Sequence, residues 1–156
     1  MNNRQLIERY AKAHTEQDWA TASEMMASDL TVVYPQSGEV FRGRDDYVRM
    51  LSTYPGDLES NADLTITTIR HRKESVYVTT SPIAAPTITV TEAGNDFIVE
   101  GVVRYPDGGI YNVVGIIELG GGKVEKETWY FAAPFEPPAW RAPYVQGSTR
   151  EGRAAS

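Results

Sequence analysis

The chain has 156 residues, the size of a single domain, and 41% of them are hydrophobic, which suffices for a core and argues against disorder. Its net charge of −6 and isoelectric point near 4.9 argue against nucleic acid or an anionic membrane as a partner, because both attract concentrated Lys and Arg. Cysteine is absent, only two histidines occur and no apolar run approaches a membrane span, so we expect a cytoplasmic protein with no disulfide, metal site or cofactor.

Three helices are expected in the first third of the chain. The first follows an Asn cap and runs to about residue 17, with Tyr10 and His14 on its apolar stripe. The second opens at Asp18 and ends near residue 29. The third opens at Asp45 and ends at the proline-glycine turn after residue 54. Together they predict a compact helical layer.

The remaining segments are typical of strands. A strand–turn–strand unit over 30–34, 35–38 and 39–42 separates the second and third helices. After the third helix we expect strands at 64–72, 76–80, 87–91, 97–105, 110–119 and 123–133. The last three are long and joined by glycine-rich turns without an intervening helix, which predicts an antiparallel meander and excludes parallel βαβ units. The pattern therefore predicts an α+β domain with a strongly bent antiparallel sheet.

The last strand carries apolar or aromatic residues on both of its faces. Period two places Trp129 and Phe131 together with Glu125 and Glu127, and places Tyr130 on the opposite face. Only one face can meet the core, so we expect the other to form a homodimer through the outer side of the sheet.

The chain beyond the last strand divides into two parts. The segment 135–144 is rich in proline and aromatic residues, and we expect it to be ordered and packed on the sheet or on a partner chain. Residues 146–156 are small and polar, which predicts a disordered tail after a single domain spanning 1–145.

The order of elements from about Arg4 to Val145 resembles the nuclear-transport-factor-2-like superfamily, and its SnoaL-like branch most of all. The resemblance is carried by EQDWATASEMMASD at 16–29, VVYPQSGEVFRGR at 32–44 and GGKVEKETWYFAAPF at 121–135. It implies a cystatin-like cone, in which three N-terminal helices pack in the bent sheet and leave one mostly apolar pocket. Members of this superfamily include ketosteroid isomerases, epoxide hydrolases, cyclases, dehydratases and non-catalytic proteins, so the fold alone implies no reaction.

The acids of the best-known members are replaced in this chain. Ketosteroid isomerases place an aspartate where this sequence has Tyr34, and a second acid near Gly115. Epoxide hydrolases and many cyclases end the last strand with Tyr-Phe-Asp, where this sequence has Ala132 as the third residue. A proton-abstracting aspartate at the position of Tyr34 or Ala132 is therefore excluded.

Other polar residues could perform acid–base chemistry. Glu100 and Arg104 share one strand face, and epoxide hydrolases carry an acid and an arginine on the corresponding strand, so Glu100 could act as a base. Alternatively, the inner face is formed by their apolar neighbours Phe97, Val99, Val103 and Tyr105. His14 could exchange a proton or be a hydrogen-bonded core residue.

We therefore predict His14, Glu100 and Tyr34 as catalytic candidates, with ligand contacts from six more residues. Those six are Tyr10, Trp19, Tyr47, Arg104, Asn112 and Tyr130. The predicted function is binding of a small hydrophobic, oxygenated molecule, with cofactor-independent lyase, isomerase, cyclase or hydrolase activity. The alternative is a non-catalytic ligand-binding or protein-interaction domain of the same fold.

Overall fold

The computed structural model describes residues 1–53, 63–71, 95–105 and 108–148 of the chain. The strands expected at 76–80 and 87–91, and the turn expected at 55–57, lie outside these residues. None of the helices in the described ranges is long and apolar enough to cross a membrane.

Three helices and six strands form the body of the molecule. The helices are α1 (Asn3–Thr15), α2 (Trp19–Met25) and α3 (Arg44–Ser52). The strands are β1 (Met26–Tyr34), β2 (Glu39–Arg42), β3 (Asp63–His71), β4 (Asp96–Arg104), β5 (Ile110–Gly120) and β6 (Lys123–Ala132). A short 3-10 helix, Ala139–Tyr144, lies near the C-terminus.

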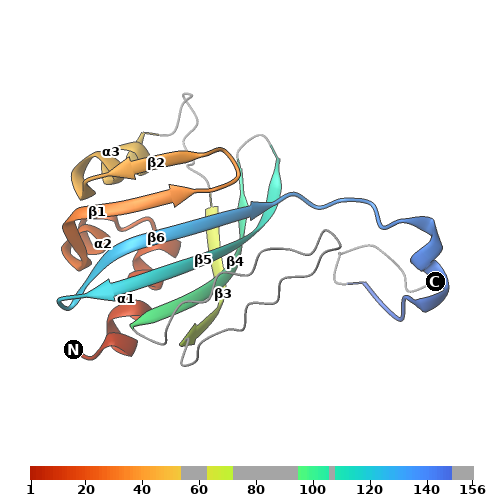
Figure 1. Cartoon of the computed structure of the whole chain (residues 1–156), viewed down its shortest axis with the longest axis horizontal. Coiled ribbons are helices and arrows are strands. Elements are labelled where there is room, and N and C mark those ends of the chain that lie inside the picture. Colours follow the sequence, from red (N-terminus) through yellow and green to blue (C-terminus); the bar gives the residue numbers. More distant parts are fainter. Residues whose placement is uncertain (54–62, 72–94, 106–107, 149–156) are drawn as a thin grey trace, which may run out of the picture.

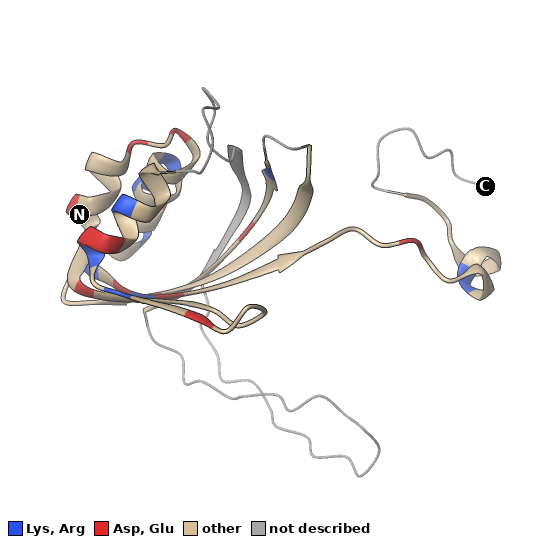
Figure 2. Ribbon diagram, turned by 90° about the horizontal axis from the view of Figure 1, so that it is seen from above, with Lys and Arg blue, Asp and Glu red and all other residues tan. Residues whose placement is uncertain are grey.

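The helices cover one face of a curled sheet, which confirms the predicted α+β cone (Figures 1 and 2). The strand order is β2-β1-β6-β5-β4-β3. The strands β4 to β6 form the predicted antiparallel meander, and β3 extends it by pairing antiparallel with β4. The sheet is nevertheless mixed, because β1 pairs with β6 in parallel. These two strands are far apart in the sequence, and no local pattern predicts their pairing.

Capping residues fix the starts of the first two helices as the sequence predicts. The Asn2 side chain accepts a hydrogen bond from the Gln5 N–H, and the Gln5 side chain accepts one from the Asn2 N–H, which forms a capping box. Asp18 accepts from the Thr21 N–H at the start of α2. That helix ends earlier than expected, at Met25, because β1 already begins at Met26.

A bulge in the last hairpin decides which residues of β6 face the helices. The register of β5 against β6 shifts between Glu118 and Leu119. Val124 and Glu127 are therefore both fully buried, although strict alternation assigns them to opposite faces. Trp129 is also buried, so the face of β6 with Glu127 and Trp129 is the inner face. The prediction that this face forms an outer dimer interface is therefore wrong.

The C-terminal arm, residues 133–148, does not pack on its own sheet, which was one of the two positions expected for it. It extends away from the helices and the sheet in both views (Figures 1 and 2). Trp140 and Tyr144 are exposed, so the arm does not bury these side chains on its own chain. Residues 146–148 of the predicted tail are exposed, and 149–156 lie outside the described residues.

Candidate functional site

A buried carboxylate lies at the centre of the cone interior. Glu127 projects from the inner face of β6 and is 0% exposed. Burying an ionised carboxylate costs several kcal/mol unless hydrogen bonds compensate for the lost water. The hydrogen bonds of Glu127 therefore decide how much of this cost is compensated.

Three neutral donors surround the Glu127 carboxylate, and each comes from a different element. The Tyr10 hydroxyl of α1 donates to Oε1. The Trp129 Nε1–H, two residues along β6, donates to Oε2 at 2.6 Å, and the Tyr47 hydroxyl of α3 lies 3.4 Å from the same oxygen. Both carboxylate oxygens thus have partners, and the cluster joins α1, α3 and β6.

A glycine on the neighbouring strand makes room for the indole of this cluster. Gly115 lies directly opposite Trp129 in the β5–β6 register. A Cβ atom added at Gly115 would lie 2.7 Å from Cζ3 of Trp129, closer than real Cβ contacts. The absence of a side chain at position 115 therefore lets the indole lie flat against β5.

The electrostatics of the cluster favour neutral groups. Burial raises the pKa of Glu127 above its usual range, although the hydrogen bonds from Trp129, Tyr10 and Tyr47 oppose the shift. Burial, and next the nearby Glu127 charge, raise the pKa values of Tyr10 and Tyr47 well above 10. Both phenols therefore remain protonated at neutral pH and serve as hydrogen-bond donors.

Tyr34 extends the cluster toward the end of the sheet. It is hydrogen-bonded to Tyr47, and burial raises its pKa to about 12. Its ring packs edge-to-face against Phe41 and Phe131, with centroids 5.0 and 5.1 Å away. Tyr34 is thus one hydrogen-bonded step from the residues that hold Glu127.

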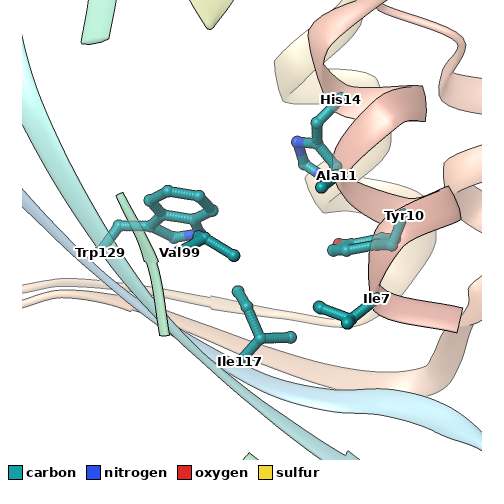
Figure 3. Close-up of a pocket in the computed structure, with 7 residues that line it drawn as sticks. All are labelled: Ile7, Tyr10, Ala11, His14, Val99, Ile117 and Trp129. Atoms are coloured by element: carbon teal, nitrogen blue, oxygen red, sulfur yellow. The ribbon is translucent and has the colours of Figure 1, made fainter. Parts of the chain in front are cut away.

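A small cavity lies between α1 and the sheet, beside Tyr10 and Trp129 (Figure 3). It is lined by Ile7, Tyr10, Ala11, His14, Val99, Ile117 and Trp129. Its volume is about 10 Å3, which is about what one water molecule needs. The cavity is therefore the size of one small polar group, set in an otherwise apolar wall.

His14 provides an imidazole at this cavity. It is buried between two aromatic rings, with centroids 4.5 Å from Tyr10 and 5.3 Å from Trp19. Burial lowers the pKa of His14 to about 4, so the ring is neutral at physiological pH. No hydrogen-bond partner for its Nε2 is found among the described residues. Most buried polar atoms have a partner, so this one calls for an explanation.

The structure brings together five of the nine residues that the sequence proposed for the site. These are Tyr10, His14, Trp19, Tyr34 and Tyr47. They come from α1, α2, α3 and the end of β1. Tyr10 and His14 line the cavity, whereas Tyr34 does not line it and joins the cluster through Tyr47.

The other four predicted residues lie on the opposite face of the sheet. Glu100 alternates with the buried Val99 and Gly101, and Arg104 is exposed at the end of β4. Asn112 and Tyr130 are likewise exposed on β5 and β6. The apolar alternative considered for β4 is thus the observed one, with Phe97, Val99 and Val103 buried, and these four side chains do not line the cavity.

Sequence reasoning missed Glu127 and Trp129 as site residues. Period two correctly grouped Glu127 with Trp129 and Phe131, but it did not show which face of β6 meets the helices. The available signal was an acid two residues before a tryptophan on a strand that is apolar toward its end. Such an acid either faces solvent together with the other residues on its side of the strand, or lies in the core with hydrogen-bond partners.

The family of the chain follows from a direct comparison of its sequence. The model of the SnoaL-like domain matches residues 4–112, which is more than half of the chain. The chain belongs to the SnoaL-like domain family. No curated protein matches the sequence significantly.

Solved structures place this SnoaL-like chain among nuclear-transport-factor-2-like folds. An NTF-2 like protein of unknown function from Burkholderia xenovorans is 27% identical, with a TM-score of 0.68 over 94% of both chains. A putative ketosteroid isomerase from Kribbella flavida is 23% identical over 96% of this chain and 91% of its own, with a TM-score of 0.69. An LEH-like epoxide hydrolase from M. tuberculosis is 15% identical over 81% and 80% of the two chains, with a TM-score of 0.55. The last two likenesses concern the fold alone.

Proposed function

We propose that this SnoaL-like protein binds a small, mainly apolar molecule through one oxygen atom, and that Tyr10 and Glu127 move a proton to or from that molecule. The observation that carries the proposal is the buried Nε2 of His14, which has no hydrogen-bond partner among the described residues and belongs to a side chain that lines the same cavity as Tyr10 of the Tyr10–Glu127 pair. A hydroxyl, ketone or epoxide oxygen of a ligand would supply the missing hydrogen bond.

Tyr10 is the group that would meet the ligand, with Glu127 behind it. Tyr10 lines the cavity, whereas Glu127 is not among the lining residues and is reached through the Tyr10 hydroxyl. When a ligand group gives a proton to the Tyr10 oxygen, the phenol can pass its own proton to Glu127. The same pair returns a proton in the reverse order, so it can act as base and then as acid.

His14 would orient the ligand oxygen. A neutral imidazole with one free ring nitrogen can donate or accept one hydrogen bond, depending on its tautomer. The depressed pKa of His14 makes an imidazolium unfavourable at this position. Its proposed role is therefore polar contact and not transfer of a full charge.

The size of the cavity limits the ligand. About 10 Å3 accommodates the oxygen-bearing group of a ligand alone. The ring or chain that carries this group must therefore displace side chains that enclose the cavity, above all the Trp129 indole, and the proposal includes this movement. Two of the similar structures carry the words ketosteroid isomerase and epoxide hydrolase in their names, which agrees with an oxygenated ligand.

One observation favours a second candidate function. Both oxygens of Glu127 already have donors, as expected for a structural network that holds α1, α3 and β6 together. In that case the protein would be a non-catalytic ligand-binding or interaction domain, and Glu127 would contribute stability alone.

Two substitutions with matched controls separate these candidates. Glu127→Gln and Tyr10→Phe remove the proton-transfer pair, whereas Glu125→Gln and Tyr130→Phe make the same chemical changes at exposed positions of β6. Binding of cyclohexanone and phenol is followed by calorimetry. Turnover of a β,γ-unsaturated cyclohexenone and of cyclohexene oxide is followed by gas chromatography.

We expect turnover of one of these probes by the wild type and by both controls, with a loss of at least a hundredfold in Glu127→Gln and Tyr10→Phe. His14→Phe should weaken binding of the oxygenated probes and leave binding of cyclohexane unchanged. Binding without turnover in every variant would overturn the catalytic part and leave the second candidate. Absence of binding to any oxygenated probe would overturn the proposal as a whole.

A further inference from the structure

Glu127 belongs to a row of four hydrogen-bonded side chains that crosses the interior. Tyr34 is hydrogen-bonded to Tyr47, and the Tyr47 hydroxyl lies 3.4 Å from Oε2 of Glu127. The Tyr10 hydroxyl donates to the other carboxylate oxygen, Oε1. We call these four residues, in the order Tyr34, Tyr47, Glu127 and Tyr10, the hydrogen-bonded row. They come from β1, α3, β6 and α1, so the row joins four elements of the fold.

The two ends of the row lie in different surroundings. Tyr10, Tyr47 and Glu127 are 2%, 2% and 0% exposed, whereas Tyr34 is partly exposed. Tyr34 is the last residue of β1, and the turn that follows it, 35–38, is exposed throughout. Tyr10, at the opposite end, lines the cavity. The row therefore connects the surface of the molecule with the cavity, and a carboxylate lies between the two.

The other contacts of Glu127 do not offer a proton a way to solvent. The Trp129 indole is bonded to Oε2, but an indole N–H is a donor only and cannot accept a proton in return. Beyond Tyr10, the cavity wall has one further titratable group, His14, and burial lowers the pKa of His14 to about 4. Of the hydrogen bonds identified for Glu127 within the described ranges, the one to Tyr47 thus leads toward a partly exposed residue.

Phenols suit this position because a hydroxyl oxygen can donate and accept at the same time. When a proton from water reaches the Tyr34 oxygen, Tyr34 gives its own proton to Tyr47, and Tyr47 gives its own to Oε2 of Glu127. The carboxylate becomes a carboxylic acid, the solvent loses one proton, and both phenols are neutral again. The reverse sequence takes a proton from Glu127 to solvent. The 3.4 Å contact is longer than that from Trp129, so we expect this step to limit the rate.

We propose that Tyr47 and Tyr34 form the path by which Glu127 exchanges its proton with solvent without passing through the cavity. The inference rests on the proposed function, in which Glu127 must regain or lose a proton after each transfer with Tyr10. It makes Tyr34 a relay residue that acts through Tyr47 and has no contact with the ligand. A relay residue changes how fast Glu127 is protonated and leaves the pKa of Glu127 as it is, which distinguishes it from a residue with a structural role.

The indole N–H of Trp129 reports the charge of Glu127, because it donates to that carboxylate at 2.6 Å. Its NMR signal in the 15N-labelled full chain is followed over pH and is recognised as the indole signal whose titration is lost in Glu127→Gln. Relaxation dispersion at the midpoint of the titration gives the rate of proton exchange at Glu127. Tyr34→Phe and Tyr47→Phe interrupt the row. Tyr130→Phe makes the same change at an exposed position of β6 and is the control.

We expect Tyr34→Phe to lower the exchange rate at least tenfold and to leave the midpoint unchanged, because Tyr34 is not among the residues bonded to Glu127. Tyr47→Phe should lower the rate as much and also raise the midpoint, since it removes a donor that favours the carboxylate. Tyr130→Phe should change neither quantity.

The same measurements separate the relay from the proposed function. Equal exchange rates in the wild type, Tyr34→Phe and Tyr47→Phe would overturn the relay, even if Glu127→Gln abolishes turnover and the proposed function stands. A midpoint that moves in Tyr34→Phe would also overturn it, because Tyr34 would then have a structural role. So would an indole signal that follows pH nowhere in the folded range. A lower rate in both row variants without turnover of any probe would support the relay and overturn the catalytic part of the proposed function.

Discussion

Protonation of His14 should weaken the fold as the pH falls. Burial lowers the pKa of His14 to about 4 in the folded chain, against an ordinary value of 6.5. The unfolded chain therefore binds this proton more tightly than the folded chain. The stability linked to neutral His14 is fully present above pH 6.5 and is lost as the pH falls toward 4.

The size of the effect follows from the two pKa values. A shift of one pKa unit corresponds to about 1.4 kcal/mol, so linkage predicts a loss of about 1.4 kcal/mol at pH 5.5 and about 3 kcal/mol at pH 4. The neighbouring Tyr10 does not contribute in this range, because its pKa lies well above 10.

Urea unfolding between pH 4 and 7.5 measures the effect. His14→Phe keeps an aromatic ring between Tyr10 and Trp19 but does not titrate. Its free energy of unfolding, subtracted from that of the wild type, should change by about 3 kcal/mol across this range. Parallel curves for the wild type and His14→Phe would refute the assignment of a buried, neutral imidazole.

Three further predictions concern the cluster and the first helix. The raised pKa of Glu127 should make the free energy of unfolding of the wild type fall as the pH rises above about 4.5, which is opposite to the effect of His14. Glu127→Gln should lack this fall when its unfolding by urea is measured over the same pH range. Gly115→Ala should displace the Trp129 indole, lower stability by about 1–3 kcal/mol and shift the tryptophan fluorescence, whereas Gly147→Ala, with open space around it, should change neither. Asn2→Ala should cost about 1 kcal/mol through loss of the capping box, and an unchanged urea midpoint would contradict this.

The sequence predicted those parts of the fold that depend on local chemistry. Asn2 and Asp18 cap their helices through their own side chains, and alternation along residues 97–133 predicted the meander. The early start of β1 was missed because Ala27 and Ser28 have weak strand propensity, and pairing with β6 overrides it. Parallel pairing of β1 with β6 is a contact between distant segments and leaves no local pattern.

The candidate site was predicted only in part, because local patterns show the buried side of a helix but not the buried face of a strand. Residues on the apolar stripes of helices, such as Tyr10, His14 and Tyr47, were found because helical periodicity shows which side is buried. Glu100 and Asn112 were misplaced because period two defines two faces of a strand and does not choose between them. Glu127 was missed for the same reason, because alternation grouped it with Trp129 without showing that their face meets the helices.

The position of Glu127 bears on whether the replacement of the family's acids indicates a loss of catalysis. At the places where related enzymes carry acids, this chain has Tyr34, Gly115 and Ala132. The interior nevertheless contains a carboxylate, because the Trp129 indole occupies the space over Gly115 and donates to Glu127 on the same strand. The identified partners of that carboxylate are neutral donors, two phenols and an indole, and not a lysine or arginine that would hold it permanently ionised. Because burial raises the pKa of this acid, it gains a proton more readily than an exposed glutamate, which favours acid–base chemistry in a dry cavity. Loss of the familiar acids therefore does not by itself make this SnoaL-like chain a non-catalytic member of its family.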